Sequence, residues 1–217
     1  MTIAADLLPA WLVTAAWIVM ALCVMSAAVR ADWRALHAAP ERYHLLYGGA
    51  LACVVLWLMS VTAIAGLWLH LLGMTSMTLI LGWRFAVLAG TAAILTYIWL
   101  IGETFAAIPV AWLLTVAIPA TVTTLLVREV QRRWSRNLFV YVLGVGFGGG
   151  ILCGLALALA GLGVLALSGQ QEMVTSALEN WPLIALMLFP EGFINGMVMT
   201  TLAVFYPDLV RTYEEVG

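Results

Sequence analysis

The sequence predicts an all-α polytopic membrane protein of about seven transmembrane helices. Of its 217 residues, 65% are apolar and only 9% are charged. Soluble globular domains carry about 25% charged residues, so this chain could not cover a water-exposed surface of its own size. Its apolar runs also approach about 20 residues, the length of helix that crosses the hydrocarbon core of a bilayer. The composition therefore excludes a soluble enzyme and makes membrane lipid the expected surroundings.

Seven apolar segments divide the chain. Gly66 separates the second from the third, residues 102–104 form a turn after the fourth, and Pro109 and Pro119 bend the fifth. The third segment has about 16 residues, so it could also be re-entrant or fused to its neighbour. The predicted spans, in a single integral membrane domain of residues 1–217, are about 9–29, 45–65, 68–83, 85–101, 105–127, 138–167 and 181–206.

The distribution of arginine predicts the orientation. Cytoplasmic loops of membrane proteins collect lysine and arginine. Seven spans with the N-terminus outside and the C-terminus in the cytoplasm put every arginine on the cytoplasmic side, whereas deleting the third span would divide them. We therefore expect a multi-pass protein of the bacterial inner membrane, with outer loops near 66–67, 102–104 and 168–180. The chain has no lysine, and its basic residues are Arg30, Arg34, Arg42, Arg84, Arg128, Arg132, Arg133, Arg136 and Arg211.

The sixth segment is rich in glycine. Gly146, Gly150 and Gly154 follow one another at intervals of four residues, the spacing that lets helix backbones approach closely. The run lies inside an apolar segment rather than between a strand and a helix, so it does not predict a nucleotide site. We expect these glycines to pack against another helix, and we infer no organic cofactor.

Two polar residues lie inside the seventh segment. A carboxylate at the centre of a bilayer costs about 2.5–3.5 kcal/mol on insertion scales, so Glu191 should face the interior of the bundle, be protonated or pair with a donor. Asn195 is one helical turn further on, on the same face. The pair could lock helix packing through internal hydrogen bonds, or it could serve cation passage or coupling to a partner.

His70, near the outer end of the third segment, is the candidate metal ligand. Imidazole binds nickel, cobalt, copper and zinc, but a second ligand is needed. His37 and His44 cannot supply it, because the predicted topology puts them on the other side of the membrane. Glu103 is read as an exposed turn residue.

No arrangement for catalysis is present. The sequence contains no catalytic triad, HExxH, nucleotide-binding or CxxC motif. Cys23, Cys53 and Cys153 lie in apolar runs and are read as small buried residues. No basic patch suggests nucleic acid. We therefore expect a protein that is not an enzyme.

Three stretches resemble a known family. The segment from His70-Leu71-Leu72-Gly73 to residue 90 is similar to part of the CbiM/NikM type, the substrate-binding membrane components of energy-coupling-factor cobalt and nickel transporters. Residues 137–142 and 189–200 resemble a divergent branch of it. The resemblance covers most of the chain after residue 45, and it implies seven spans with the N-terminus outside. It also implies a divalent transition-metal ion as substrate, other membrane subunits and a separate ATPase module.

The resemblance further implies which residues hold the metal. Family members use the N-terminal amine, the backbone and side chain of a histidine at position two, and the histidine that corresponds to His70. This chain has Thr2 at position two, so an imidazole is missing. The terminal amine belongs to Met1, or to Thr2 if Met1 is removed.

Two functions follow. The first is the membrane component of an energy-coupling-factor-like transporter for a cobalt- or nickel-like ion. The alternative is a transport-inactive structural or assembly subunit of a larger membrane complex, for which the missing histidine is the reason. An intramembrane enzyme has nothing in its favour beyond Glu191.

Overall fold

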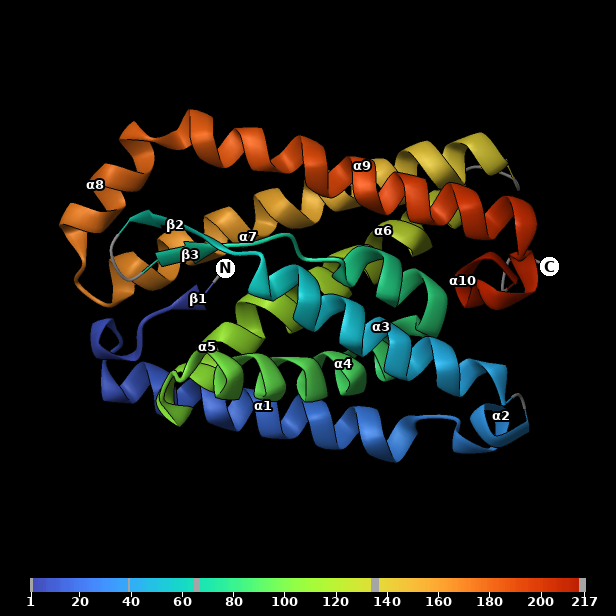
Figure 1. Ribbon diagram of the computed structural model, residues 1–217, viewed down its shortest axis with the longest axis horizontal. Helices are drawn as coiled ribbons and strands as arrows, with labels where there is room; N and C mark the ends of the chain where they lie inside the picture. Colours follow the sequence, from blue (N-terminus) through green and yellow to red (C-terminus); the bar gives the residue numbers. More distant parts are fainter. Residues whose placement is uncertain (1, 39, 65–66, 134–136, 215–217) are drawn as a thin grey trace.

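Long helices make up most of the protein (Figure 1). The computed structural model describes residues 2–38, 40–64, 67–133 and 137–214. The elements are β1 (Thr2–Ile3), η1 (Ala5–Leu7), α1 (Ala10–Arg30), α2 (Trp33–Ala38), α3 (Glu41–Leu58), β2 (Val61–Ile64), β3 (Leu67–Leu69), α4 (Met74–Ile101), η2 (Phe105–Ala107), α5 (Ile108–Trp112), η3 (Leu113–Ala117), α6 (Ile118–Arg133), η4 (Val140–Phe147), α7 (Gly148–Leu167), α8 (Gln171–Glu179), α9 (Trp181–Phe205), η5 (Pro207–Leu209) and α10 (Arg211–Glu214).

The described residues contain 5 helical stretches that are long and apolar enough to cross a membrane. Chain passages run back and forth between two ends of the bundle (Figure 1). One end, here called the sheet end, carries the three strands and α8. The other, here called the arginine end, carries α2 and α10. The 5 stretches are Ala10–Arg30, Met74–Ile101, Phe105–Arg133, Val140–Leu167 and Trp181–Phe205.

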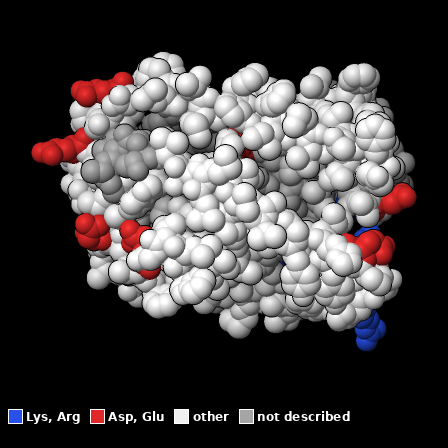
Figure 2. All heavy atoms as spheres, viewed as in Figure 1, with Lys and Arg blue, Asp and Glu red and all other residues white. Residues whose placement is uncertain are grey.

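The surface between the two ends is apolar. On the face drawn in Figure 2, acidic residues lie at both ends, arginine is visible only in the right-hand half, and the middle is almost free of charge. Large apolar side chains point outward, for example Leu22 at 58%, Trp99 at 73% and Leu186 at 69% exposure. Such a belt is stable only where the surroundings are also apolar. The all-α polytopic membrane architecture predicted from composition is therefore the observed one.

The second and third predicted spans differ from the structure. The helix predicted over 45–65 ends at Leu58, and the helix predicted over 68–83 begins only at Met74. Between them lie β2 and β3. Val61, Thr62 and Ile64 of β2 are β-branched residues, which favour strands over helices.

The break predicted between the third and fourth spans lies at Gly82. There α4 adopts φ 74° and ψ 163°, so it consists of a short helix up to about residue 81 and a longer one after it. Glycine populates positive φ at little cost, which other residues do not. The third passage of the chain thus combines an extended segment with a short helix.

The strands form a small antiparallel sheet in the order β1-β3-β2, an addition to the purely helical fold that the sequence predicted. Thr2 pairs with Trp68, Ile3 with Leu67, and Val61 with Leu69. Strand pairing satisfies backbone groups that an apolar environment cannot. It also fixes the N-terminal residues beside the segment that leads to His70.

Several predicted loops contain further helix. The loop predicted over 30–44 includes α2 and the start of α3, and the outer loop predicted over 168–180 includes α8. Helix α6 continues to Arg133, so the basic loop predicted over 128–137 begins later. In the fifth predicted span, a π-helical turn at Leu113–Ala117 precedes Pro119, which lacks the N–H that a regular turn would use.

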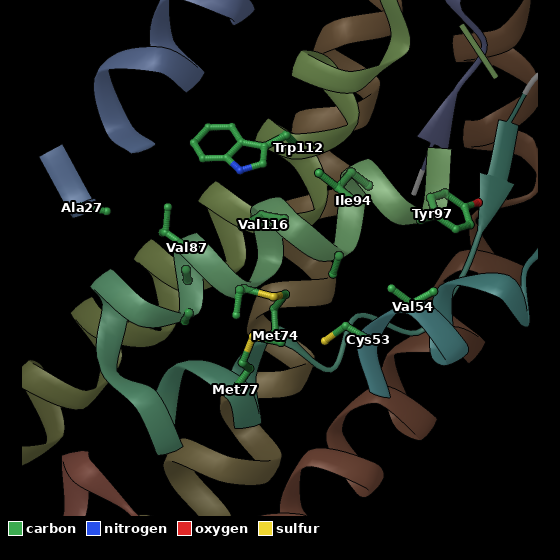
Figure 3. Packing of buried hydrophobic residues seen from close by; sticks show 14 of the residues in the cluster. Ala27, Cys53, Val54, Met74, Met77, Val87, Ile94, Tyr97, Trp112 and Val116 are labelled. Carbon is green, nitrogen blue, oxygen red and sulfur yellow. The ribbon is translucent and has the colours of Figure 1, made fainter. Parts of the chain in front are cut away.

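The main hydrophobic core surrounds both parts of α4 (Figure 3). Met74 from the short part, Ile94 and Tyr97 from the longer part, and Trp112 from α5 are at most 1% exposed. The Trp112 indole N–H donates to Thr91 Oγ1 at 2.8 Å, which satisfies its polar atom. The core therefore holds the broken helix in place from several sides.

Candidate functional site

The loop of residues 70–73, here called the His70 loop, joins β3 to α4. Gly73 has φ 67°, and a Cβ at this position would lie 2.8 Å from Leu56 Cδ1, so the site requires glycine. The Leu72 carbonyl accepts a hydrogen bond from the Trp57 indole at 3.0 Å. The loop is thus held on one side by α3.

Glu191 of α9 holds the loop on the other side. Its Oε2 accepts the Leu72 N–H at 2.6 Å, and its Oε1 accepts the Gly73 N–H at 3.2 Å. These are donors at the start of a helix, which have no partner within the helix itself. The N-terminal end of a helix is also the end at which a negative charge is stabilised. Glu191, which is only 4% exposed, therefore caps the short helix of α4 from a distant part of the chain.

Asn195 completes the cap. Its Oδ1 accepts the Ser76 N–H at 2.8 Å and the Ser76 hydroxyl at 2.7 Å. Its Nδ2 donates to Glu191 Oε1 at 2.6 Å and to the Glu191 carbonyl at 2.7 Å. Asn195 is completely buried, and these bonds use its donor and acceptor atoms together. The pair singled out in the sequence thus binds the helix start of α4.

The glycines of the sixth segment lie against α9. A Cβ at Gly150 would be 2.9 Å from the Glu191 carbonyl oxygen and 2.9 Å from Gly192 Cα. A Cβ at Gly146 would be 3.1 Å from Met199 Cβ, and one at Gly154 would be 2.6 Å from Leu188 Cδ2. The absence of side chains at these positions gives α9 the room to bring Glu191 to the His70 loop.

His70 is 5% exposed and lies among aromatic rings. Its ring centroid is 5.8 Å from that of Trp57 and 5.8 Å from that of Tyr97, and its Nδ1 is 3.2 Å from the Leu71 carbonyl oxygen. His70 and Glu191 both line a cavity of about 50 Å³ whose other walls are mostly leucine. The volume is sufficient for a small ion or a water molecule.

The N-terminal strand adjoins this region. Thr2 is fully buried, and its Oγ1 has no hydrogen-bond partner among the described residues. Its strand partner, Trp68, is two residues before His70. Met1, whose terminal amine the family resemblance implies as a metal ligand, lies outside the described residues.

No group of three or more His, Cys, Asp or Glu side chains that could hold a metal ion occurs within the described ranges. His37 belongs to α2, at the arginine end, and is hydrogen-bonded to the Tyr43 hydroxyl. Glu103 accepts a hydrogen bond from the N–H of its neighbour Thr104 at 3.3 Å. Cys53 and Cys153 are buried free thiols, and Cys23 is half-buried.

Sequence reasoning missed the partners of Glu191 and Asn195. The Leu72 and Gly73 amides and Ser76 lie about 120 residues away in the chain, and backbone amides have no signature in a sequence. The available signal was Gly73, followed at once by a helical segment within an apolar run. Such a helix start inside a membrane needs acceptors from elsewhere.

Comparison with known proteins extends this picture. A family model described as CbiM, the cobalt uptake substrate-specific transmembrane region, matches residues 2–209. The crystal structure of a truncated transition metal transporter shares the fold, with a TM-score of 0.71 at 16% identity, over 96% of this chain and 99% of that one. No curated protein matches the sequence significantly. The family resemblance drawn from the sequence is confirmed, and the chain belongs to the CbiM family.

Proposed function

We propose that this protein is the substrate-binding membrane component of an energy-coupling-factor-like transporter in the bacterial inner membrane. Its substrate is a cobalt- or nickel-like divalent ion. The chain crosses the membrane seven times, with α3 and the passage formed by β3, the His70 loop and the short helix of α4 as two of the crossings. The sheet end faces outward, and the arginine end faces the cytoplasm, in agreement with the preference of arginine for cytoplasmic loops.

The observation that carries this proposal is the juxtaposition of the N-terminal strand and the His70 loop. Strand β1 pairs with β3, and β3 leads directly into the loop. The cap formed by Glu191 and Asn195 holds that loop in one conformation. A rigid loop that presents an imidazole next to the chain terminus is suited to nitrogen coordination of a nickel- or cobalt-like ion. Neutral nitrogen donors also allow release, which a transporter requires.

Replacing His70 with alanine should weaken metal binding by more than about tenfold, because even residues that only orient a ligand contribute 10–100-fold. The measurement is titration of Ni²⁺ and Co²⁺ into the purified full chain, with metal content determined after gel filtration. His44→Ala is the matched control, since His44 is exposed on α3 and distant in sequence from the loop. Equal affinity in wild type and the His70→Ala variant, or no binding by either, would contradict the metal site.

A second candidate function is a transport-inactive structural or assembly subunit of a larger membrane complex. The residue at position two favours it, because Thr2 offers a buried hydroxyl where family members have an imidazole. The chain itself has no nucleotide-binding motif, so transport requires a separate ATPase module.

Purification of the tagged full chain from its native membrane in mild detergent should separate the two functions. For the transporter we expect an ATPase and a transmembrane coupling subunit to co-purify in fixed proportion. Retention of an unrelated membrane complex in their place would support the assembly subunit.

A further inference from the structure

A second hollow lies at the arginine end, remote from the His70 loop. Its volume is about 480 Å³, and it is lined by the end of α1, the break in α4, the last turns of α6 and the start of α10. Arg30, Arg84, Arg128 and Arg211 all border it. Four of the chain's nine basic residues, from four separate elements, thus surround one hollow.

No aspartate or glutamate is among the described residues that line the hollow. Arg30, Arg84 and Arg128 are exposed, and within the described chain no salt bridge involves them. Arg211 has contacts of its own within the chain, which leaves the positive charges of the other three around the hollow. Like charges around one concave surface repel each other and raise the local positive potential. An anion in the hollow would relieve that repulsion.

The remaining lining residues suit the same ligand. Thr78, Thr121, Thr124 and Gln131 place hydroxyl and amide groups around the hollow. Guanidinium groups bind phosphoryl oxygens through paired hydrogen bonds, and hydroxyl groups add single ones. The walls also include Leu125, which is 57% exposed, where the apolar part of α6 gives way to Arg128. The hollow therefore lies where the apolar belt ends, which in the proposed orientation is the region of phospholipid head groups.

We propose that this hollow binds a phosphoryl group of an anionic ligand, either the head group of an anionic phospholipid or a free phosphate compound. The break of α4 at Gly82 forms part of the site, since a Cβ there would lie 3.2 Å from Arg211 Cδ. A ligand that bridges Arg30, Arg84 and Arg128 joins α1, the longer part of α4 and α6 at this end. It stabilises the bundle without touching the His70 loop.

The test is native mass spectrometry of the delipidated full chain with added phosphatidylglycerol, phosphatidylcholine or inorganic phosphate. We expect phosphatidylglycerol to bind at least tenfold more tightly than phosphatidylcholine, and an Arg84→Ala/Arg128→Ala variant to lose at least tenfold of that affinity. Arg133→Ala is the matched control, because Arg133 pairs with Glu129 on α6 outside the hollow. Binding should also weaken as salt is raised.

A displacement experiment distinguishes a lipid head group from a free phosphate compound. Displacement of phosphatidylglycerol by millimolar inorganic phosphate assigns the site to a free phosphate compound, and resistance to it assigns the site to lipid. An Arg84→Lys/Arg128→Lys variant keeps the charge and should retain part of the affinity. It serves as the control for a loss of affinity in the alanine variant that is caused by misfolding. The proposal fails if the double alanine variant binds as well as the Arg133→Ala control, or if neither ligand binds. If neither ligand binds, an acidic segment of a partner protein becomes the alternative ligand of the hollow.

Discussion

Replacing Glu191 with alanine should lower the free energy of unfolding by about 2–6 kcal/mol. The substitution leaves the buried Leu72 amide and the partly buried Gly73 amide without an acceptor, and each unsatisfied donor costs about 1–3 kcal/mol. Thermal or denaturant unfolding in a single detergent, followed by circular dichroism, measures the loss.

A second variant of Glu191 and a control variant test the role of these hydrogen bonds. Glu191→Gln keeps the size of the side chain but turns one acceptor into a donor, so it should still be destabilised, by less than the alanine variant. Glu172→Ala is the control, because Glu172 is an exposed carboxylate in the first turn of α8. Equal stability of the Glu191→Ala and Glu172→Ala variants would show that the cap contributes nothing.

The destabilisation caused by Glu191→Ala should also be local. Hydrogen exchange should accelerate at Leu72 and Gly73 before the rest of α4, since these two amides lose their acceptors while the core around Met74 and Ile94 is unchanged. Uniform acceleration over the whole bundle would instead indicate a general packing defect.

Replacing Gly150 with alanine is expected to have the second large effect, a destabilisation of about 1–3 kcal/mol, the usual cost of overpacking. The new methyl group would lie 2.9 Å from the Glu191 carbonyl oxygen and from Gly192 Cα. Both are backbone atoms, which cannot rotate out of the way. Helix α9 must therefore move away from α7, and the Glu191 carboxylate moves with it. The same unfolding measurement detects the change.

Glycine substitutions elsewhere on α7 supply the comparison. Nothing lies within 4 Å of a Cβ at Gly163, so Gly163→Ala should be neutral or stabilising by up to about 1 kcal/mol. Gly154→Ala meets only the end of the flexible Leu188 side chain and should fall between the two. A Gly150→Ala variant as stable as Gly163→Ala would contradict the close contact of α7 and α9.

The two large effects should not add. Both variants disturb the same contact between α9 and the start of α4, so the double variant should lose less than the sum of the single losses. Additive losses would mean that Glu191 and Gly150 act independently.

Much of the protein could be predicted from the sequence alone. The small number of charged residues and the lengths of the apolar segments determined that this is a membrane protein, because such a surface is solvated by lipid and not by water. The boundaries of the first and last long helices, α1 and α9, follow directly from their apolar runs. Glu191 and Asn195 could be picked out because a polar residue in lipid is costly.

Only the tertiary structure decided how residues 59–73 run and what Glu191 binds. The β-branched residues of β2 favour a strand, but whether residues 67–69 are extended depends on β1, which comes from the N-terminus to pair with β3. Glu191 and Asn195 accept from backbone N–H groups about 120 residues away. Every residue except proline has such a group, so no residue type marks it. The sequence determined which buried polar groups need hydrogen-bond partners. The tertiary structure decided which groups those partners are, because a backbone group is selected as a partner by its position in space.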